Sequence, residues 1–151
     1  MEEKIAIVVG SKTDIPYLNG AKTILDEFKV NYEIFILSAH RNIDKTIEFS
    51  ETAESKGFEV IIACAGMAAH LPGVISAKTI LPVIGVPLPT SEIRGIDALL
   101  SIVQMPSGVP VATMAIGKSG VKNAALLAIS ILARKNTGLK KKLIKFKKSL
   151  K

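Results

Sequence analysis

The chain has 151 residues, of which 48% are hydrophobic, and this size fits one domain that buries roughly two-thirds of its unfolded surface. No apolar run reaches the about 20 residues of a membrane span, the start at residues 1–4 is acidic rather than basic, and the single cysteine excludes an internal disulfide. These features argue against a membrane-spanning or secreted disulfide-stabilised protein, so we expect a cytoplasmic protein with no membrane partner.

The first predicted strand covers residues 4–9, which are nearly all apolar, as is typical of a central parallel strand. It is followed by Ser11, Thr13 and Asp14 at the start of a helix predicted to run to about residue 28, with Asp14 placed to cap it. Hydroxyls and free N–H groups at a helix start favour a phosphate. No Walker or dinucleotide-binding glycine motif is present, so capping without a ligand is the competing interpretation.

The second predicted strand, residues 32–37, ends at Ser38, His40 and Arg41, and a helix is predicted over residues 43–56. A titratable imidazole beside a guanidinium suits the carboxyl edge of a parallel sheet, where open α/β folds bind their ligands. We interpret His40 as a chemical group and Arg41 as a residue that recognises substrate charge. The alternative is an exposed histidine beside a surface arginine.

The third predicted strand, residues 59–64, opens into a loop of mostly small residues at 65–73. Small residues leave the backbone bare, so a flat ring or a carboxylate can approach the main-chain amides. The alternative is a close-packed strand-to-helix turn with a structural histidine bonded to backbone. Cys64 is predicted to be a buried, inert thiol. The candidate ligand-binding residues of the loop are Gly66, Ala69, His70 and Leu71.

Two further strands are predicted at residues 82–86 and 110–116, with a polar loop at 89–92 and a helix to about residue 103 between them. Strands alternating with helices at this spacing predict an α/β fold in which a doubly wound parallel sheet forms the middle of three layers. A helix predicted over residues 121–133 is apolar on most sides, which indicates a core position or a subunit interface.

The positive charge is concentrated in residues 134–151, which contain nine Lys or Arg residues and no acid. We expect one domain over residues 1–151, made of an α/β core at 1–135 and a basic amphipathic helix at 136–151. Docking of this helix on its own domain or on a neighbouring subunit is favoured over RNA or membrane binding. Its predicted apolar positions are Leu139, Leu143, Ile144, Phe146 and Leu150.

Six segments in fixed order carry a resemblance to a known family. The chain resembles the bacterial and archaeal N5-carboxyaminoimidazole ribonucleotide mutases, which are the class I branch of the phosphoribosylaminoimidazole carboxylases of purine synthesis. The match runs from residue 5 to about residue 132. The segments are GSKTD (10–14), SAHR (38–41), AGMAAHLPG (65–73), PVIGVP (82–87), LLSIVQMPSGVPVAT (99–113) and AIGKSGVKNAALLA (115–128).

The resemblance implies a flavodoxin-like domain assembled into a homo-octamer, with active sites between subunits and with neither a metal nor an organic cofactor. By motif position it implies that His40 is catalytic and that Ser11, Asp14 and Arg41 bind substrate. Thr13 stands where many members carry serine. The chain departs from the family pattern at Ile15, where tryptophan is usual, and at Asn42 and Ile43, where Thr-Pro is common.

The implied reaction converts N5-carboxyaminoimidazole ribonucleotide to 4-carboxy-5-aminoimidazole ribonucleotide. We hypothesise that the carbamate loses CO2, that the pocket retains this CO2, and that the ring carbon C4 attacks it while His40 moves the protons. One alternative is direct carboxylation by CO2, the class II reaction, although class II relatives typically have lysine at the position of Arg41. The other is a nucleotide-binding module without turnover, which uses its basic tail on RNA.

Overall fold

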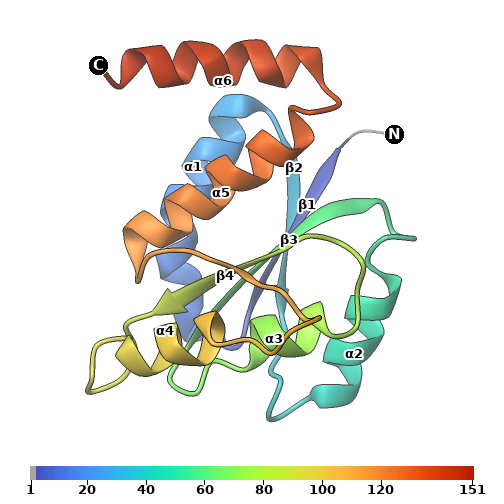
Figure 1. Ribbon diagram of the computed structural model, residues 1–151, viewed down its shortest axis with the longest axis vertical. Helices are drawn as coiled ribbons and strands as arrows, with labels where there is room; N and C mark the ends of the chain where they lie inside the picture. The colour runs from blue at the N-terminus through green and yellow to red at the C-terminus, as the bar shows by residue number, and fades with distance from the viewer. Residues whose placement is uncertain (1–2) are drawn as a thin grey trace.

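Five parallel strands form one sheet in the order β2-β1-β3-β4-β5 (Figure 1). The computed structural model describes residues 3–151, and Met1 and Glu2, part of the acidic start, lie outside the described residues. This order is flavodoxin-like and reverses direction between β1 and β3, where folds of this class bind their ligands. The predicted doubly wound parallel sheet is confirmed. The strands are β1 (Lys4–Val9), β2 (Asn31–Ile36), β3 (Phe58–Gly66), β4 (Val83–Leu88) and β5 (Ala112–Thr113).

Helices cover both faces of the sheet because alternate strand residues point to opposite sides. In β1, Ile5 and Ile7 belong to a buried cluster with the helices α1 and α5, whereas Ala6 and Val8 belong to a second cluster with α2, α3 and α4. The sheet is therefore the middle of three layers. The helices are α1 (Asn19–Phe28), α2 (Ile43–Thr52), α3 (Leu71–Ser76), α4 (Ile96–Val103), α5 (Lys118–Leu132) and α6 (Thr137–Ser149), with a 3-10 helix, η1 (Lys12–Leu18), before α1.

The basic C-terminal segment forms α6, which lies across the amino-terminal end of the sheet (Figure 1). Leu139 is buried, and Leu143 and Phe146 pack against the same core cluster, so the helix docks on its own domain. Ile144 and Leu150 were predicted on the apolar face of this helix from their spacing, but their side chains are exposed. Of the helices in residues 3–151, none is long and apolar enough to cross a membrane.

Local structure differs from the prediction at the start of the first helical segment. Residues 12–18 form the 3-10 helix η1, which contains Pro16, a residue that cannot donate a backbone hydrogen bond. Ser11, rather than Asp14, caps this helix, because its side chain accepts a bond from the backbone N–H of Thr13. The α-helix proper begins only at Asn19.

Two other predicted segments differ in extent. The fifth strand covers only Ala112–Thr113 rather than residues 110–116, and before it the Ser76 hydroxyl donates to the Pro110 carbonyl at 2.6 Å. That carbonyl is thus engaged outside the sheet, and proline offers no N–H for a ladder. The loop predicted over residues 65–73 contains the start of α3, whose first turn includes Pro72, a residue favoured at that position.

Cys64 lies in β3 and is fully buried, as predicted. Burial raises the pKa of its thiol to about 12, and the negative charge of Asp14 adds to the shift. A thiol with this pKa is almost wholly protonated at neutral pH, and it is the thiolate that reacts. The interpretation of Cys64 as a packed rather than a nucleophilic residue fits this environment.

Candidate functional site

A pocket of about 620 Å³ lies at the carboxyl edge of the sheet. Its walls come from the loops that follow β1, β2 and β3, together with Thr90 from the loop after β4. The structure therefore brings together all of the candidate site residues that the sequence indicated. These are Ser11, Thr13, Asp14, Ser38, His40, Arg41, Gly66, Ala69, His70 and Leu71.

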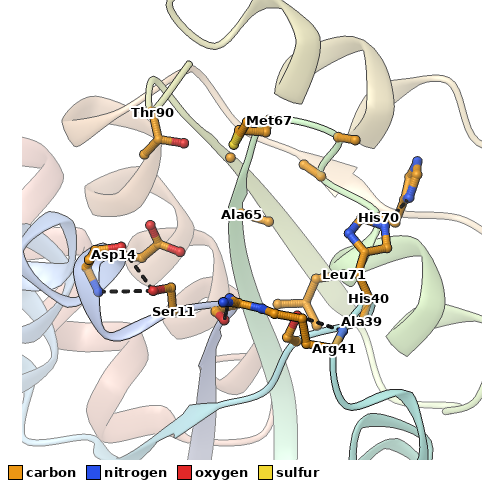
Figure 2. A pocket seen from close by; sticks show the side chains of 16 residues that line it. Ser11, Asp14, Ala39, His40, Arg41, Ala65, Met67, His70, Leu71 and Thr90 are labelled. Carbon is orange, nitrogen blue, oxygen red and sulfur yellow. Dashed lines mark hydrogen bonds between the residues drawn. The ribbon is translucent and has the colours of Figure 1, made fainter.

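Arg41 is held in one orientation by the two loops beside it. Its Nη2 donates to the Gly10 carbonyl at 3.1 Å, and its Nε donates to the Ser38 hydroxyl at 3.3 Å. The same hydroxyl accepts the backbone N–H of Arg41 at 3.2 Å. Figure 2 shows the guanidinium extended toward Ser11. A guanidinium has five N–H donors, so Arg41 keeps donors for an anion after these bonds are made.

Two hydroxyls lie beside the guanidinium. The Ser11 Oγ accepts from the backbone N–H of Thr13 at 3.3 Å and from the Thr13 hydroxyl at 3.0 Å. Because Ser11 accepts both bonds, its own hydroxyl proton stays available to a ligand. Together with Arg41, these groups form an anion-binding side of the pocket.

Asp14 is the buried acid of the site, with 8% of its surface exposed. Burial raises the pKa of its carboxyl above the ordinary value, while a backbone hydrogen bond with Ser11 and the charge of Arg41 act in the opposite direction. Placing a carboxylate in this position costs stability, because its charge loses part of its hydration. Such a cost at a pocket wall is typical of a residue kept for binding.

The two histidines of the chain meet at the opposite side of the pocket (Figure 2). His40 Nε2 and His70 Nδ1 lie 2.6 Å apart, and the rings are nearly perpendicular, with an interplanar angle of 89°. The alternative that His70 is a structural histidine whose ring bonds to backbone does not describe this geometry. Its ring contacts the other imidazole.

Thr90 and Met67 also line the pocket, and the sequence had not singled them out. A Cβ added to Gly66 would lie 1.8 Å from Thr90 Oγ1, so glycine is what lets the Thr90 side chain pack over the end of β3. Met67 has a positive φ of 55°, a left-handed conformation that is uncommon for methionine. Thr90 belongs to the polar loop predicted after the fourth strand, and the shared edge of parallel strands was the signal that could have included it.

The site combines an anion-binding side with an imidazole pair, so it can hold a small anionic molecule and exchange protons with it. The loop between these sides presents small residues, which leave room for a flat ring against the backbone. Among residues 3–151, no group of three or more His, Cys, Asp or Glu side chains could hold a metal ion.

Comparisons with known proteins agree with one another. The model of the family described as AIR carboxylase matches residues 4–151. Relatives named N5-carboxyaminoimidazole ribonucleotide mutase include one from Pyrococcus abyssi, 51% identical and covering 98% of this chain and 84% of its own, and one from Escherichia coli K12, 49% identical and covering 97% and 86%. The crystal structure of Treponema denticola PurE superposes with a TM-score of 0.87 at 25% identity, over 98% of this chain and 91% of its own.

Proposed function

The chain belongs to the AIR carboxylase family, and we propose that it is an N5-carboxyaminoimidazole ribonucleotide mutase, an isomerase of purine biosynthesis. The relatives of that name match nearly the whole chain at about half identity. The observation that carries the proposal is the pocket itself, in which an anion-binding side faces an imidazole across a strip of bare backbone. This is the arrangement that a phosphorylated imidazole substrate needs if protons are to move at its ring.

Each side of the pocket has a role in the proposal. Ser11, Thr13 and Arg41 bind the phosphate, because two hydroxyls and a fixed guanidinium offer several donors to its oxygens. Asp14 accepts hydrogen bonds from the ribose hydroxyls. Residues 66–71 hold the imidazole ring and keep water from the CO2 released in the reaction.

The chemistry proceeds by loss and return of CO2, with His40 moving the protons. The bond between the exocyclic nitrogen and the carbamate carbon breaks, the electron pair stays on nitrogen, and this nitrogen takes a proton from His40. The ring carbon C4 then attacks the retained CO2, a carbon–carbon bond forms, and His40 takes the proton that C4 loses. Protons and electrons balance, and His40 ends in its starting state.

A homo-oligomer, expected to be an octamer, is part of the proposal. Ile96, Leu100 and Val103 lie along α4 at helical spacing, and Ile93 lies in the turn before it; these side chains have 48% to 58% of their surfaces exposed. Helix α4 lies beside the tip of β4 (Figure 1). A stripe of this kind suits contact with another copy of the chain, and sedimentation of a Leu100→Glu variant tests the assignment. The intact protein is expected to sediment as the octamer and the variant as smaller species.

The cytoplasm is the proposed location. The substrate is a phosphorylated intermediate, and a bilayer excludes such charged molecules because moving them into an apolar medium is costly. An enzyme that acts on it therefore belongs in the compartment where purine nucleotides are made.

The test is product formation from N5-carboxyaminoimidazole ribonucleotide in bicarbonate-depleted buffer, beside a parallel reaction with aminoimidazole ribonucleotide and bicarbonate. The mutase is expected to convert the carbamate faster than it decays by itself. Conversion only in the bicarbonate reaction would identify a direct carboxylase and overturn the role inferred from Arg41. Inactivity in both would point to a binding module without turnover.

A further inference from the structure

The basic charge of the protein is gathered at the end of the sheet that does not carry the pocket. Residues 134–151 hold nine of the chain's 20 Lys and Arg residues and none of its 13 Asp and Glu residues. Residues 1–133 therefore carry 11 basic and 13 acidic residues. Helix α6 lies at the opposite end of the strands from the pocket (Figure 1), and none of its lysines lines the pocket. This charge therefore serves something other than the anion-binding side of the pocket.

Docking of α6 decides which of its side chains point outward. Leu143 and Phe146 pack against the core cluster, and the Asn136 side chain caps the first turn. With 3.6 residues per turn, most of the lysines fall on the side away from this contact, around Ile144, which is 48% exposed. We call these six exposed residues the outer lysine face: Lys140, Lys141, Lys145, Lys147, Lys148 and Lys151.

The outer lysine face has no acidic partner. Within residues 3–151 none of its lysines forms an ion pair, whereas Lys135 pairs with Glu59 at 3.4 Å and Lys142 donates to the Phe28 carbonyl at 2.7 Å. Several of the six lie three or four positions apart, so they are neighbours on the helix surface and repel each other. A helix that is only solvated commonly carries acids between its lysines. Here the repulsion is left uncompensated, and an external anion with several charges would relieve it.

We propose that the outer lysine face binds the phosphate backbone of a double-stranded nucleic acid without reading its sequence. The face covers residues 140–151, about 16 Å of helix, which matches the axial rise of about five base pairs. Ammonium groups bind phosphates as compact point charges. The face contains neither an aromatic ring on which an unpaired base could stack nor an arginine that could read a base edge. This inference goes beyond the proposed function and does not depend on it.

Two other kinds of partner fit this surface less well. A membrane-surface helix buries an apolar side among lipids, but the apolar side of α6 is packed on the core, and only Ile144 lies among the outer lysines. Leu150 is also exposed, yet it belongs to the docked side, four positions after Phe146. Protein–protein interfaces, including those between copies of one chain, are depleted in lysine. Docking on its own domain uses the other side of α6, so it does not compete with a nucleic acid.

Binding is tested by fluorescence anisotropy of a labelled RNA duplex with the full-length protein over a series of salt concentrations. The logarithm of the association constant should fall linearly with the logarithm of the salt concentration, because bound phosphates release their counterions. The triple variant Lys141→Gln, Lys145→Gln and Lys148→Gln should weaken binding about tenfold or more and reduce this slope by about three, one for each lysine. Failure of the unaltered protein to bind the duplex would overturn the proposal.

The matched control removes the same charge from exposed positions outside α6. It is the triple variant Lys45→Gln, Lys56→Gln and Lys122→Gln. In about 0.1 M salt, where distant charges are screened, it should bind the duplex within about twofold of the unaltered protein. Equal losses in the two triple variants would assign binding to net charge and overturn the proposal.

Lysine acetylation followed by mass spectrometry locates the contact in the unaltered protein, so it does not depend on a variant that folds. The outer lysine face should react quickly in the free protein and slowly with the duplex bound. Slow reaction without the duplex would show that another copy of the chain covers the face, and this would overturn the proposal. Tighter binding to phosphatidylserine vesicles than to the duplex, at equal phosphate and salt, would favour a membrane and overturn it. Displacement of the duplex by the product nucleotide would place the duplex in the pocket and also overturn it.

Discussion

The two ends of the parallel strands differ in what their residues do. At the carboxyl end, small residues and polar side chains leave a pocket of about 620 Å³, and the histidine pair lies in it. At the amino end, α6 packs against α1 and α5, with Phe146 meeting Phe28 edge to face at 5.7 Å between ring centroids. The comparison teaches that one sheet separates the side chains that react from many of those that stabilise. Substitutions at the two ends should therefore have separable effects.

The largest effect is expected at the carboxyl end, from His40→Asn. Asparagine cannot exchange protons near neutral pH, so turnover should be abolished, while nucleotide binding stays within about tenfold because the phosphate contacts remain. Turnover assays and calorimetric titration with the product nucleotide measure the two quantities. The thermal midpoint should not fall, because His40 is exposed. Substantial residual turnover would refute the role of His40.

At the amino end, the opposite result is expected from Leu139→Ala. Leu139 is 6% exposed, so its truncation should lower the free energy of unfolding by about 2 to 4 kcal/mol. The kcat of the folded fraction should not change. Ile144→Ala on the same helix is the matched control, because Ile144 is 48% exposed and its truncation should cost within about 0.5 kcal/mol. Equal losses in urea denaturation of the two variants would contradict the docking of α6.

Asp14→Asn should raise the stability of the protein while weakening substrate binding, because the buried Asp14 carboxylate opposes folding at the carboxyl end of the strands. Its pKa is raised in the folded protein, so the ionised carboxylate opposes folding at pH values above that pKa. The variant should therefore have the higher thermal midpoint near neutral pH. The difference should shrink as the pH falls below the raised pKa of the folded protein and vanish below the ordinary carboxyl pKa of 3.8. The KM should rise about tenfold through loss of the charged hydrogen bonds to the ribose. A lower midpoint at neutral pH would show that the carboxylate stabilises the fold.

The smallest effect is expected from Lys142→Met in α6. The Lys142 ammonium donates to the Phe28 carbonyl at 2.7 Å, at the carboxyl end of α1, where a cation is favourable. Loss of this bond should lower the free energy of unfolding by about 1 kcal/mol, with less effect at high salt. Lys145→Met is the control, since it removes an equal charge from an exposed position of the same helix. If both variants lose the same stability, the effect belongs to net charge rather than to this bond.

The sequence was sufficient to predict the layers of the fold and most of the pocket wall, because apolar strands and the polar residues that follow them are local patterns. His40 and Arg41 could be predicted in this way, since they lie in the loop that follows a strand. The contact of Thr90 with Gly66 could not, because it depends on how closely two loops approach. The His40–His70 bond likewise depends on the strand order, which places the two loops on either side of β1.

The extents of the elements were predicted less well where single backbone bonds decide them. The fifth strand was predicted over residues 110–116 from its apolar composition, yet only Ala112–Thr113 pairs with β4. Pro110 lacks an N–H, and its carbonyl is bonded by Ser76. A bond between residues 34 positions apart leaves no trace in local composition.

The complete burial of Cys64 gives the protein an intrinsic reporter of its own opening. The thiol lies in β3, between the two helical layers and close behind the pocket. Its pKa of about 12 lowers its reactivity further, because very little thiolate is present near neutral pH. A thiol reagent can modify the chain only during excursions that separate the sheet from its helices. The rate of labelling thus measures the frequency of these excursions at one site, and no cysteine has to be engineered into the chain. A bound nucleotide that holds the loops together should lower the rate at which the reagent labels Cys64.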